Sequence, residues 1–302
     1  MAKKIKRDHE YAYDKRLLKT LVTTYYNVQE QCLGYKQRQL AKARAAAPPL
    51  HNEDNLAFES INEGFKEVMK MCEKEIKKVL KRFPIWNDHL KQVTGVGHMI
   101  GAVCVAKFDP LDAPAPEGYG LEHEGAYEGE YTFYERQEDG EINIETRDCI
   151  MRQRTASQFW SYAGLGVIEV SDGAGGTKMV GARPVKGKKI NYDPWLRAKL
   201  LGVLAPSFIK CNAPYRVFYD ERKKFREEKE WGASKMHRHK DAMRHMIKCF
   251  LMDLFYVWRH QLDLKTRKPY AIEKLGLTPS QAWHVEEHPG FTKVKESAAL
   301  TA

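Results

Sequence analysis

Two long stretches near the start of the chain carry apolar residues at helical spacing, and this pattern constrains the fold more than any other feature. Within residues 14–45 and 55–80, apolar side chains recur mostly at steps of three and four. In the second stretch the opposite face is rich in Lys and Glu. The pair Pro48-Pro49 separates the two stretches. We expect two long helices that pair antiparallel, either as a hairpin within one chain or as a coiled coil between subunits. Two ordinary surface helices that cover a core are the alternative.

Further helices are predicted in the second half of the chain. Residues 234–261 place apolar side chains on one face, while the other face carries Lys235, Arg238, Lys240, Arg244 and Lys248. A shorter helix is expected at residues 152–162, and another begins near Pro194, because proline suits a first helical turn. The glycine-rich stretch between them, residues 164–187, is predicted to be a loop.

Residues 109–150 break the helical pattern. Two runs with strand-like alternation, residues 131–135 and 141–146, flank the turn signal Asp139-Gly140. Between residues 109 and 148 there are thirteen Asp and Glu but only two Arg, which gives this segment a charge of −11. Because the net charge of the whole chain is +10, the remaining residues carry +21. The fold class is therefore mainly α with a small inserted β-hairpin, and the insertion is acidic. We expect the basic remainder of the chain to bind polyanions. The acidic segment either folds back onto these basic residues and competes with a polyanion, or is solvated and makes no such contact.

A glycine turn, Thr94-Gly-Val-Gly-His98, joins an amphipathic helical segment at residues 85–93 to a nearly all-apolar one at residues 99–106. This is the pattern of a helix-hairpin-helix, in which backbone N–H groups at the start of a helix bind a phosphate. Gly95, Gly97 and His98 are therefore candidate contacts to a nucleic-acid backbone. Basic residues further along the chain are candidates for additional phosphate contacts, namely Arg183, Lys186, Lys188, Lys189, Arg197, Arg244 and Lys248.

Composition and spacing argue against several other kinds of site and location. The six cysteines form no Cys-x-x-Cys pair, which favours free thiols in a reducing cytoplasm and no zinc. The histidines near residue 240 lack cysteine or carboxylate partners at ligand spacing, so no metal and no cofactor are expected in this chain. No run approaches the roughly 18 apolar residues that a membrane span needs, and no membrane contact is expected. Four aromatic residues lie near glycines and lysines, where they either stack on unpaired bases or pack in the core: Trp160, Tyr162, Tyr192 and Trp195.

Between about residues 86 and 259, a series of short motifs resembles the C-terminal domain of the insertion-sequence transposases of the IS one-ten type. That group includes the Piv-like invertases and is described as bridge-RNA-guided. The matching motifs, in chain order, are Thr94-Gly-Val-Gly-His98, Phe159-Trp-Ser-Tyr-Ala-Gly-Leu165, Ser171-Asp-Gly173, Asp193-Pro-Trp-Leu-Arg197, Pro214-Tyr-Arg-Val-Phe-Tyr219 and His239-Lys-Asp-Ala-Met-Arg-His-Met-Ile-Lys248.

The resemblance implies a protein that cuts and rejoins DNA in a prokaryotic cell or its virus, with Ser171 as the nucleophile. A serine hydroxyl needs a base, a metal site or surrounding positive charge to attack a phosphodiester. Members of the family carry an N-terminal RuvC-like domain with metal-binding carboxylates, and residues 1–90 show no such pattern. The implied partners are therefore DNA, a structured guide RNA, further copies of the chain, and a separate RuvC-like nuclease subunit that depends on Mg²⁺.

These observations predict three parts: a helical hairpin or coiled-coil region at residues 1–84, a DNA-binding domain at residues 85–265 with the acidic insertion at 109–150, and a tail at residues 266–302. Three functions are compatible with them. The first is a transposase-like DNA strand-transfer protein. The second is a noncatalytic nucleic-acid-binding protein derived from that domain. The third is a regulatory oligomer whose acidic insertion mimics DNA.

Overall fold

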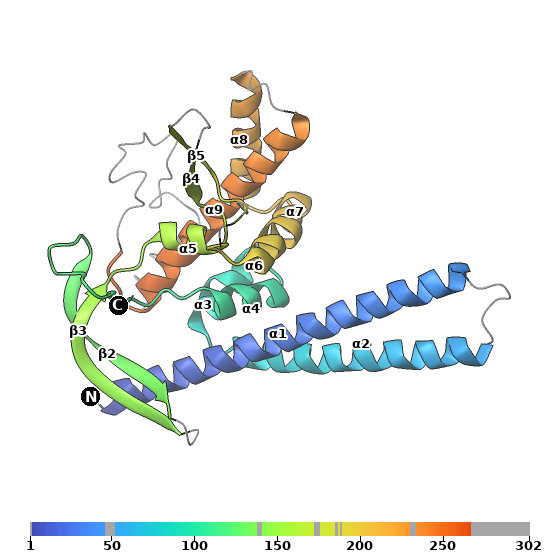
Figure 1. Ribbon diagram of the computed structural model, residues 1–302, viewed down its shortest axis with the longest axis horizontal. Coiled ribbons are helices and arrows are strands. Elements are labelled where there is room, and N and C mark those ends of the chain that lie inside the picture. Colours follow the sequence, from blue (N-terminus) through green and yellow to red (C-terminus); the bar gives the residue numbers. More distant parts are fainter. Residues whose placement is uncertain are drawn as a thin grey trace. The chain divides into compact units, whose positions relative to one another are not determined.

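Helices make up most of the chain in the computed structural model, which describes residues 2–45, 52–137, 141–171, 176–184, 187, 189–229 and 234–266. The chain divides into two compact units, Met1–Phe108 and Asp109–Ala302. The predicted mainly helical fold with a small antiparallel sheet is confirmed (Figure 1). The predicted tail beyond residue 266 lies outside the described residues.

The first unit is built on two long helices, α1 (Ala2–Ala45) and α2 (Asn52–Leu80), which lie antiparallel and in contact (Figure 1). Their facing sides bury apolar residues at helical spacing, such as Leu18, Val22 and Ile76. A buried amide, Asn62, donates hydrogen bonds to Gln39 Oε1 and to the carbonyl of Phe58. The predicted pairing of the two helices thus occurs within one chain.

Three short helices complete the first unit: α3 (Pro84–Asp88), the 3-10 helix η1 (Leu90–Gln92) and α4 (His98–Lys107). The single helical segment expected at residues 85–93 is divided, because His89 has non-helical dihedral angles (φ −131°, ψ −71°). Helix α4 is almost entirely buried and contacts α1 and α2. Gly101 lets Trp86 pack directly on α4, since an added Cβ would lie 2.5 Å from the indole ring. Residues 85–107, assigned from the sequence to the second domain, therefore lie with the first unit.

The second unit contains the predicted β-hairpin, formed by β2 (Ala126–Arg136) and β3 (Ile142–Arg152), with the two-residue strand β1 (Ala113–Pro114) on the other side of β3. Its base is held by the buried Arg259, which donates to Asp112 Oδ1 (2.6 Å) and to the carbonyl of Pro110 (2.8 Å). Tyr127 in β2 donates to the second oxygen of Asp112 (2.9 Å). A shared carboxylate thus ties the acidic hairpin to the helical core.

The core of the second unit forms around α9 (Lys235–Gln261). Phe250 and Phe255 are fully buried on this helix, and Phe159 from α5 (Ala156–Tyr162) meets Phe255 edge-on, with ring centroids 5.1 Å apart. Helix α5 begins four residues later than predicted, because Arg152 belongs to β3 and Thr155 forms a capping box with Gln158. Helix α8 (Arg216–Glu228) packs along α9.

The glycine-rich stretch predicted as a loop contains a second hairpin, β4 (Val167–Ser171) and β5 (Thr177–Gly181). The prediction of a loop is wrong for these residues, because Val167, Ile168 and Val170 are β-branched and favour a strand. The hairpin is followed by α6 (Pro194–Lys199), the π-helix η2 (Leu200–Leu204) and α7 (Ala205–Lys210), which form one continuous helical stretch. Within the wide turn, the amide of Ala205 donates to the carbonyl of Leu200, just before Pro206. A widened turn at this point accommodates a proline, which can neither donate nor fit a regular α-turn.

Candidate nucleic-acid interface

A glycine with a positive φ arranges the backbone of the candidate site. Gly164 follows α5 with φ +67°, and an added Cβ there would lie 2.5 Å from the ring of Tyr192. The amide of Asp193 donates to the carbonyl of Tyr162 (2.9 Å), and the amide of Ala182 donates to the carbonyl of Gly166 (3.0 Å). The end of α5, the end of β5 and the start of α6 are thereby held side by side.

Arg197 lies one turn into α6. The side chain of Asp193 caps this helix by accepting a hydrogen bond from the amide of Leu196 (2.9 Å), and Pro194 occupies its first turn. The guanidinium of Arg197 donates to the carbonyl of Ala182 (2.6 Å) and lies 5.3 Å from the ring centroid of Tyr192. Arg197 is therefore fixed at the base of the β4–β5 hairpin.

Arg244 on α9 reaches the same place. An added Cβ at Gly181, the last residue of β5, would lie 2.8 Å from the Arg244 guanidinium, so the glycine leaves room for this charge. Burial lowers the pKa of Arg244, and the charge of Arg197 lowers it further. The two guanidinium groups therefore act on each other electrostatically.

Lys248 lies one turn further along α9, against Trp160. The Lys248 ammonium is 5.1 Å from the centroid of the Trp160 ring, and the indole N–H donates to the backbone carbonyl of Lys248 (2.9 Å). Burial lowers the pKa of Lys248, and the charges of Arg222 and Arg244 lower it as well. This lysine is half-buried among like charges rather than on a solvated helix face.

Two arginines from α8 complete the group and bring the carboxylate that partly balances it. Arg222 and Arg226 each donate to Asp241 Oδ2 at 2.8 Å. Burial alone would raise the pKa of Asp241, but the hydrogen bonds from Arg226 and Arg222 lower it, so this carboxylate stays ionised. This oxygen, shared by two arginines of α8, holds α8 against α9.

His245 lies among the same groups. Burial and the neighbouring charges of Arg222 and Lys248 lower its pKa to about 4, so the imidazole is neutral at pH 7.

The structure therefore gathers five basic side chains from α6, α8 and α9, which we call the cationic cluster: Arg197, Arg222, Arg226, Arg244 and Lys248. Asp241 is the one carboxylate among the described groups that act on the pKa values of Arg244, His245 and Lys248. A partly buried group of guanidinium and ammonium ions with a single counter-charge suits the oxygens of a phosphate. The sequence pointed to three of the five residues and missed Arg222 and Arg226, whose spacing of four on α8 was the available signal.

The remaining predicted basic residues and Ser171 are not part of this cluster. Ser171 is exposed at the far end of β4, where it pairs with Thr177, whereas Gly181 at the base pairs with Val167. Four residues along a strand correspond to about 13 Å, so Ser171 lies roughly that far along the hairpin from the level of Arg244. Arg183 and Lys189 are exposed. Lys186, Lys188 and the motif residues Asp172 and Gly173 lie outside the described residues.

The glycine turn belongs to the first unit. Gly95 has φ +90°, Gly97 is exposed and caps α4, and the amide of Val96 already donates to the carbonyl of Val93 (3.0 Å). The first intrahelical hydrogen bond of α4 runs from the amide of Gly101 to the carbonyl of Gly97. The three amides at the start of α4, residues 98–100, therefore have no intrahelical acceptor. The ring of His98, in contrast, is engaged: its Nε2 is 2.8 Å from Glu73 Oε1 on α2.

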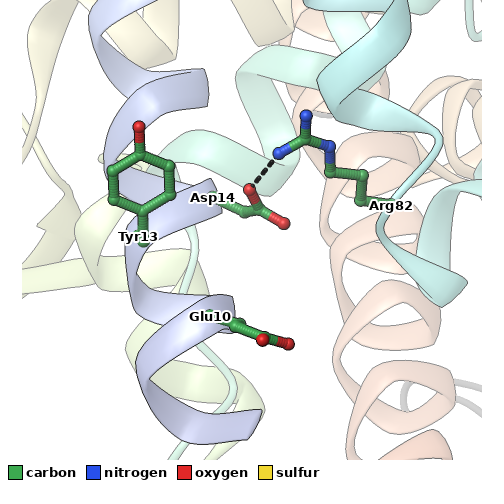
Figure 2. Close-up of a pocket in the computed structure, with 4 residues that line it drawn as sticks. All are labelled: Glu10, Tyr13, Asp14 and Arg82. Atoms are coloured by element: carbon green, nitrogen blue, oxygen red, sulfur yellow. Dashed lines mark hydrogen bonds and ion pairs between the residues drawn. The ribbon is translucent and has the colours of Figure 1, made fainter. Parts of the chain in front are cut away.

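One cavity of the first unit involves residues to which the sequence gave no role. Figure 2 shows Glu10, Tyr13 and Asp14 from α1 and Arg82 around a cavity of about 380 Å³. The guanidinium of Arg82 donates to Asp14 Oδ1 at 2.5 Å, so this arginine is already bound by a carboxylate. With Glu10 as a further acidic residue, the cavity does not suit a phosphate.

Within the described ranges, no three His, Cys, Asp or Glu side chains gather in a way that could hold a metal ion. None of the described helices is both long and apolar enough to cross a bilayer. The chain matches no protein-family model, no curated protein and no solved structure.

Proposed function

We propose that this protein binds DNA through the cationic cluster and acts in transposition or recombination. The observation that carries the DNA-binding part is the gathering of five basic side chains in a half-buried position, where Asp241 is the one carboxylate among their described interactions and acts on four of them. Like charges held together at a partly buried site repel one another, and burial weakens their hydration. A phosphate relieves both effects, and release of counterions from the DNA adds to the affinity.

The glycine turn is the second phosphate contact in this proposal. An exposed Gly97 and three helix-start amides without an intrahelical acceptor support it, because such amides bind anions. The segment before the turn consists of α3 and η1 rather than one helix, so the motif differs from a regular helix-hairpin-helix. His98, held by Glu73, orients the turn instead of reaching outward.

Binding is tested by fluorescence anisotropy with a labelled DNA oligonucleotide. We expect Arg244→Gln or Lys248→Gln to weaken binding by about tenfold each, roughly 1.4 kcal/mol, because each removes a phosphate contact. Lys240→Gln is the matched control, since Lys240 is exposed on the same helix and outside the cluster. Equal losses in all three variants would show that only the overall charge matters, and the cluster would lose its role.

Strand transfer by Ser171 is the catalytic part of the proposal and rests on the resemblance to the transposases. Ser171 is exposed at the end of β4, which supports this assignment. The cationic cluster, about 13 Å away along the hairpin, holds the strand rather than activating the serine. The activating metal site is then supplied by a RuvC-like nuclease subunit.

The catalytic part is tested by DNA cleavage assays with Ser171→Ala and with Thr177→Ala, its cross-strand neighbour. A serine nucleophile predicts that only Ser171→Ala abolishes cleavage and joining, whereas both variants bind DNA like the wild type. Cleavage that survives in Ser171→Ala removes the nucleophile and leaves a noncatalytic DNA-binding protein.

A further inference from the structure

Cations of the second unit lie over several aromatic rings, among them Arg222 of the cluster over Phe225 on its own helix (5.5 Å). Three further pairs involve rings on α5 and at the start of α6. Lys248 lies over Trp160 (5.1 Å to the ring centroid), Arg197 over Tyr192 (5.3 Å) and Lys199 over Trp195 (5.3 Å). All three rings are partly exposed. A cation beside an aromatic face is the combination with which proteins bind unpaired nucleotides, since the cation binds the phosphate and the ring stacks on the base.

Of these rings, Trp160 is the one best placed to receive a base. Tyr192 packs directly on Gly164, which takes up part of its surface, and so supports Arg197. The cation over Trp195 is Lys199, which lies outside the cationic cluster. The cation over Trp160 is Lys248, a cluster residue that also interacts electrostatically with Arg244.

Trp160 is also held in a fixed orientation. Its neighbour Phe159 is buried against Phe255, which anchors α5 on α9. The capping box of Thr155 and Gln158 fixes the start of α5. The indole N–H is bound to the carbonyl of Lys248. A ring that is already oriented loses little conformational entropy when a base stacks on it.

We infer that Trp160, Lys248 and Arg244 form a binding site for an unpaired nucleotide of single-stranded DNA, with the base on the indole ring and the phosphate on the two cations. This site rests on the proposed DNA binding and specifies which form of DNA is bound there. In a duplex the faces of the bases are covered by their neighbours, so the phosphates can reach the cations while the ring gains nothing. A single strand uses both parts of the site.

The test compares the affinities for an oligothymidine and for a duplex hairpin with the same number of nucleotides. The wild type is expected to bind the single strand at least about tenfold more tightly. Trp160→Leu is expected to lose that preference while it keeps the duplex affinity, and Trp160→Phe is expected to retain most of it, because a ring remains. Tyr162→Leu, an exposed aromatic residue two positions further along α5, is the matched control and keeps the preference.

The possible results separate this inference from the proposed function. The nucleotide site is overturned if the wild type binds both DNAs equally, or if Trp160→Leu keeps the preference for the single strand. In either case, the proposed function still stands if Lys248→Gln weakens DNA binding. Absence of binding to either DNA overturns both. Circular dichroism and thermal unfolding establish that Trp160→Leu is folded. If it is not, tryptophan fluorescence decides: stacking of a base on the indole predicts that the oligothymidine quenches the wild type and quenches Trp160→Phe much less. Equal quenching of the two proteins overturns the nucleotide site.

Discussion

Gly181 allows the guanidinium of Arg244 to lie against the base of the β4–β5 hairpin. A substitution at Gly181 can therefore displace this charge without removing it. In Gly181→Ala, the added Cβ would lie 2.8 Å from the guanidinium, so the flexible end of Arg244 must shift. We expect DNA affinity to fall about threefold to tenfold with little change in the free energy of unfolding. Binding titrations and urea unfolding measure the two effects.

Gly202→Ala is the control for that variant, because an added Cβ at Gly202 meets no atom within 4 Å. It is expected to leave the DNA affinity unchanged. If Gly181→Ala also binds DNA like the wild type, the position of the Arg244 guanidinium does not matter for binding.

His245 makes stability depend on pH in a defined window. Its pKa is about 4 in the folded protein against an ordinary value of 6.5. Between these values the unfolded chain binds a proton that the folded chain does not, so the free energy of unfolding falls as the pH decreases from 6.5 toward 4. The groups that face it are Arg222 and Arg226 from α8 and Asp241 and Lys248 from its own helix.

The effect of His245 is isolated by His245→Gln, which cannot take up the proton. Between pH 7 and pH 4.5, the wild type is expected to lose about 2 to 3 kcal/mol more stability than this variant. Denaturant unfolding at the two pH values measures the difference. Identical pH dependence in the two proteins would mean that His245 is not buried among the cations.

At the scale of secondary-structure elements, the N-terminal cap of α6 is a separate determinant of the site, because it fixes the helix that carries Arg197. Asp193→Ala removes the acceptor for the amide of Leu196 and is expected to lower the free energy of unfolding by about 1 kcal/mol. Asp193→Asn keeps a capping oxygen and is expected to remain within a few tenths of the wild type. Urea unfolding distinguishes them; equal losses would assign the effect to charge rather than to the cap.

Elements with a long apolar periodicity could be predicted from the sequence. Helices α2 and α9 lie close to their expected bounds, because residues such as Ile76 and Phe250 recur on one face. The hairpin β4–β5 was missed, because its strands have only five residues each and its surrounding glycines are typical of loops. The sequence predicts one helix where the structure has α3 and η1, since no glycine or proline marks the break at His89.

At the scale of the whole molecule, the site could be predicted only as a list of basic residues. Arg197, Arg244 and Lys248 are visible in the sequence as positive charges, but their convergence depends on the contact of α8 with α9 and on the turn at Gly164. Contacts between elements that are distant in the chain leave no local pattern in the sequence. For the same reason, the role of Asp241 as an internal counter-charge for Arg222 and Arg226 could not be inferred from its position on a basic helix.

The dependence of DNA binding on salt tests the central claim most directly, because it counts the phosphate contacts that the protein makes. The logarithm of the association constant is measured against the logarithm of salt concentration for the wild type, for the double variant Arg244→Gln/Lys248→Gln, and for the exposed control Lys235→Gln/Lys240→Gln. The cationic cluster predicts that the slope decreases by about 2 in the first double variant and stays near the wild-type value in the control. Equal slopes in the two double variants, or binding that does not weaken with salt, would contradict it.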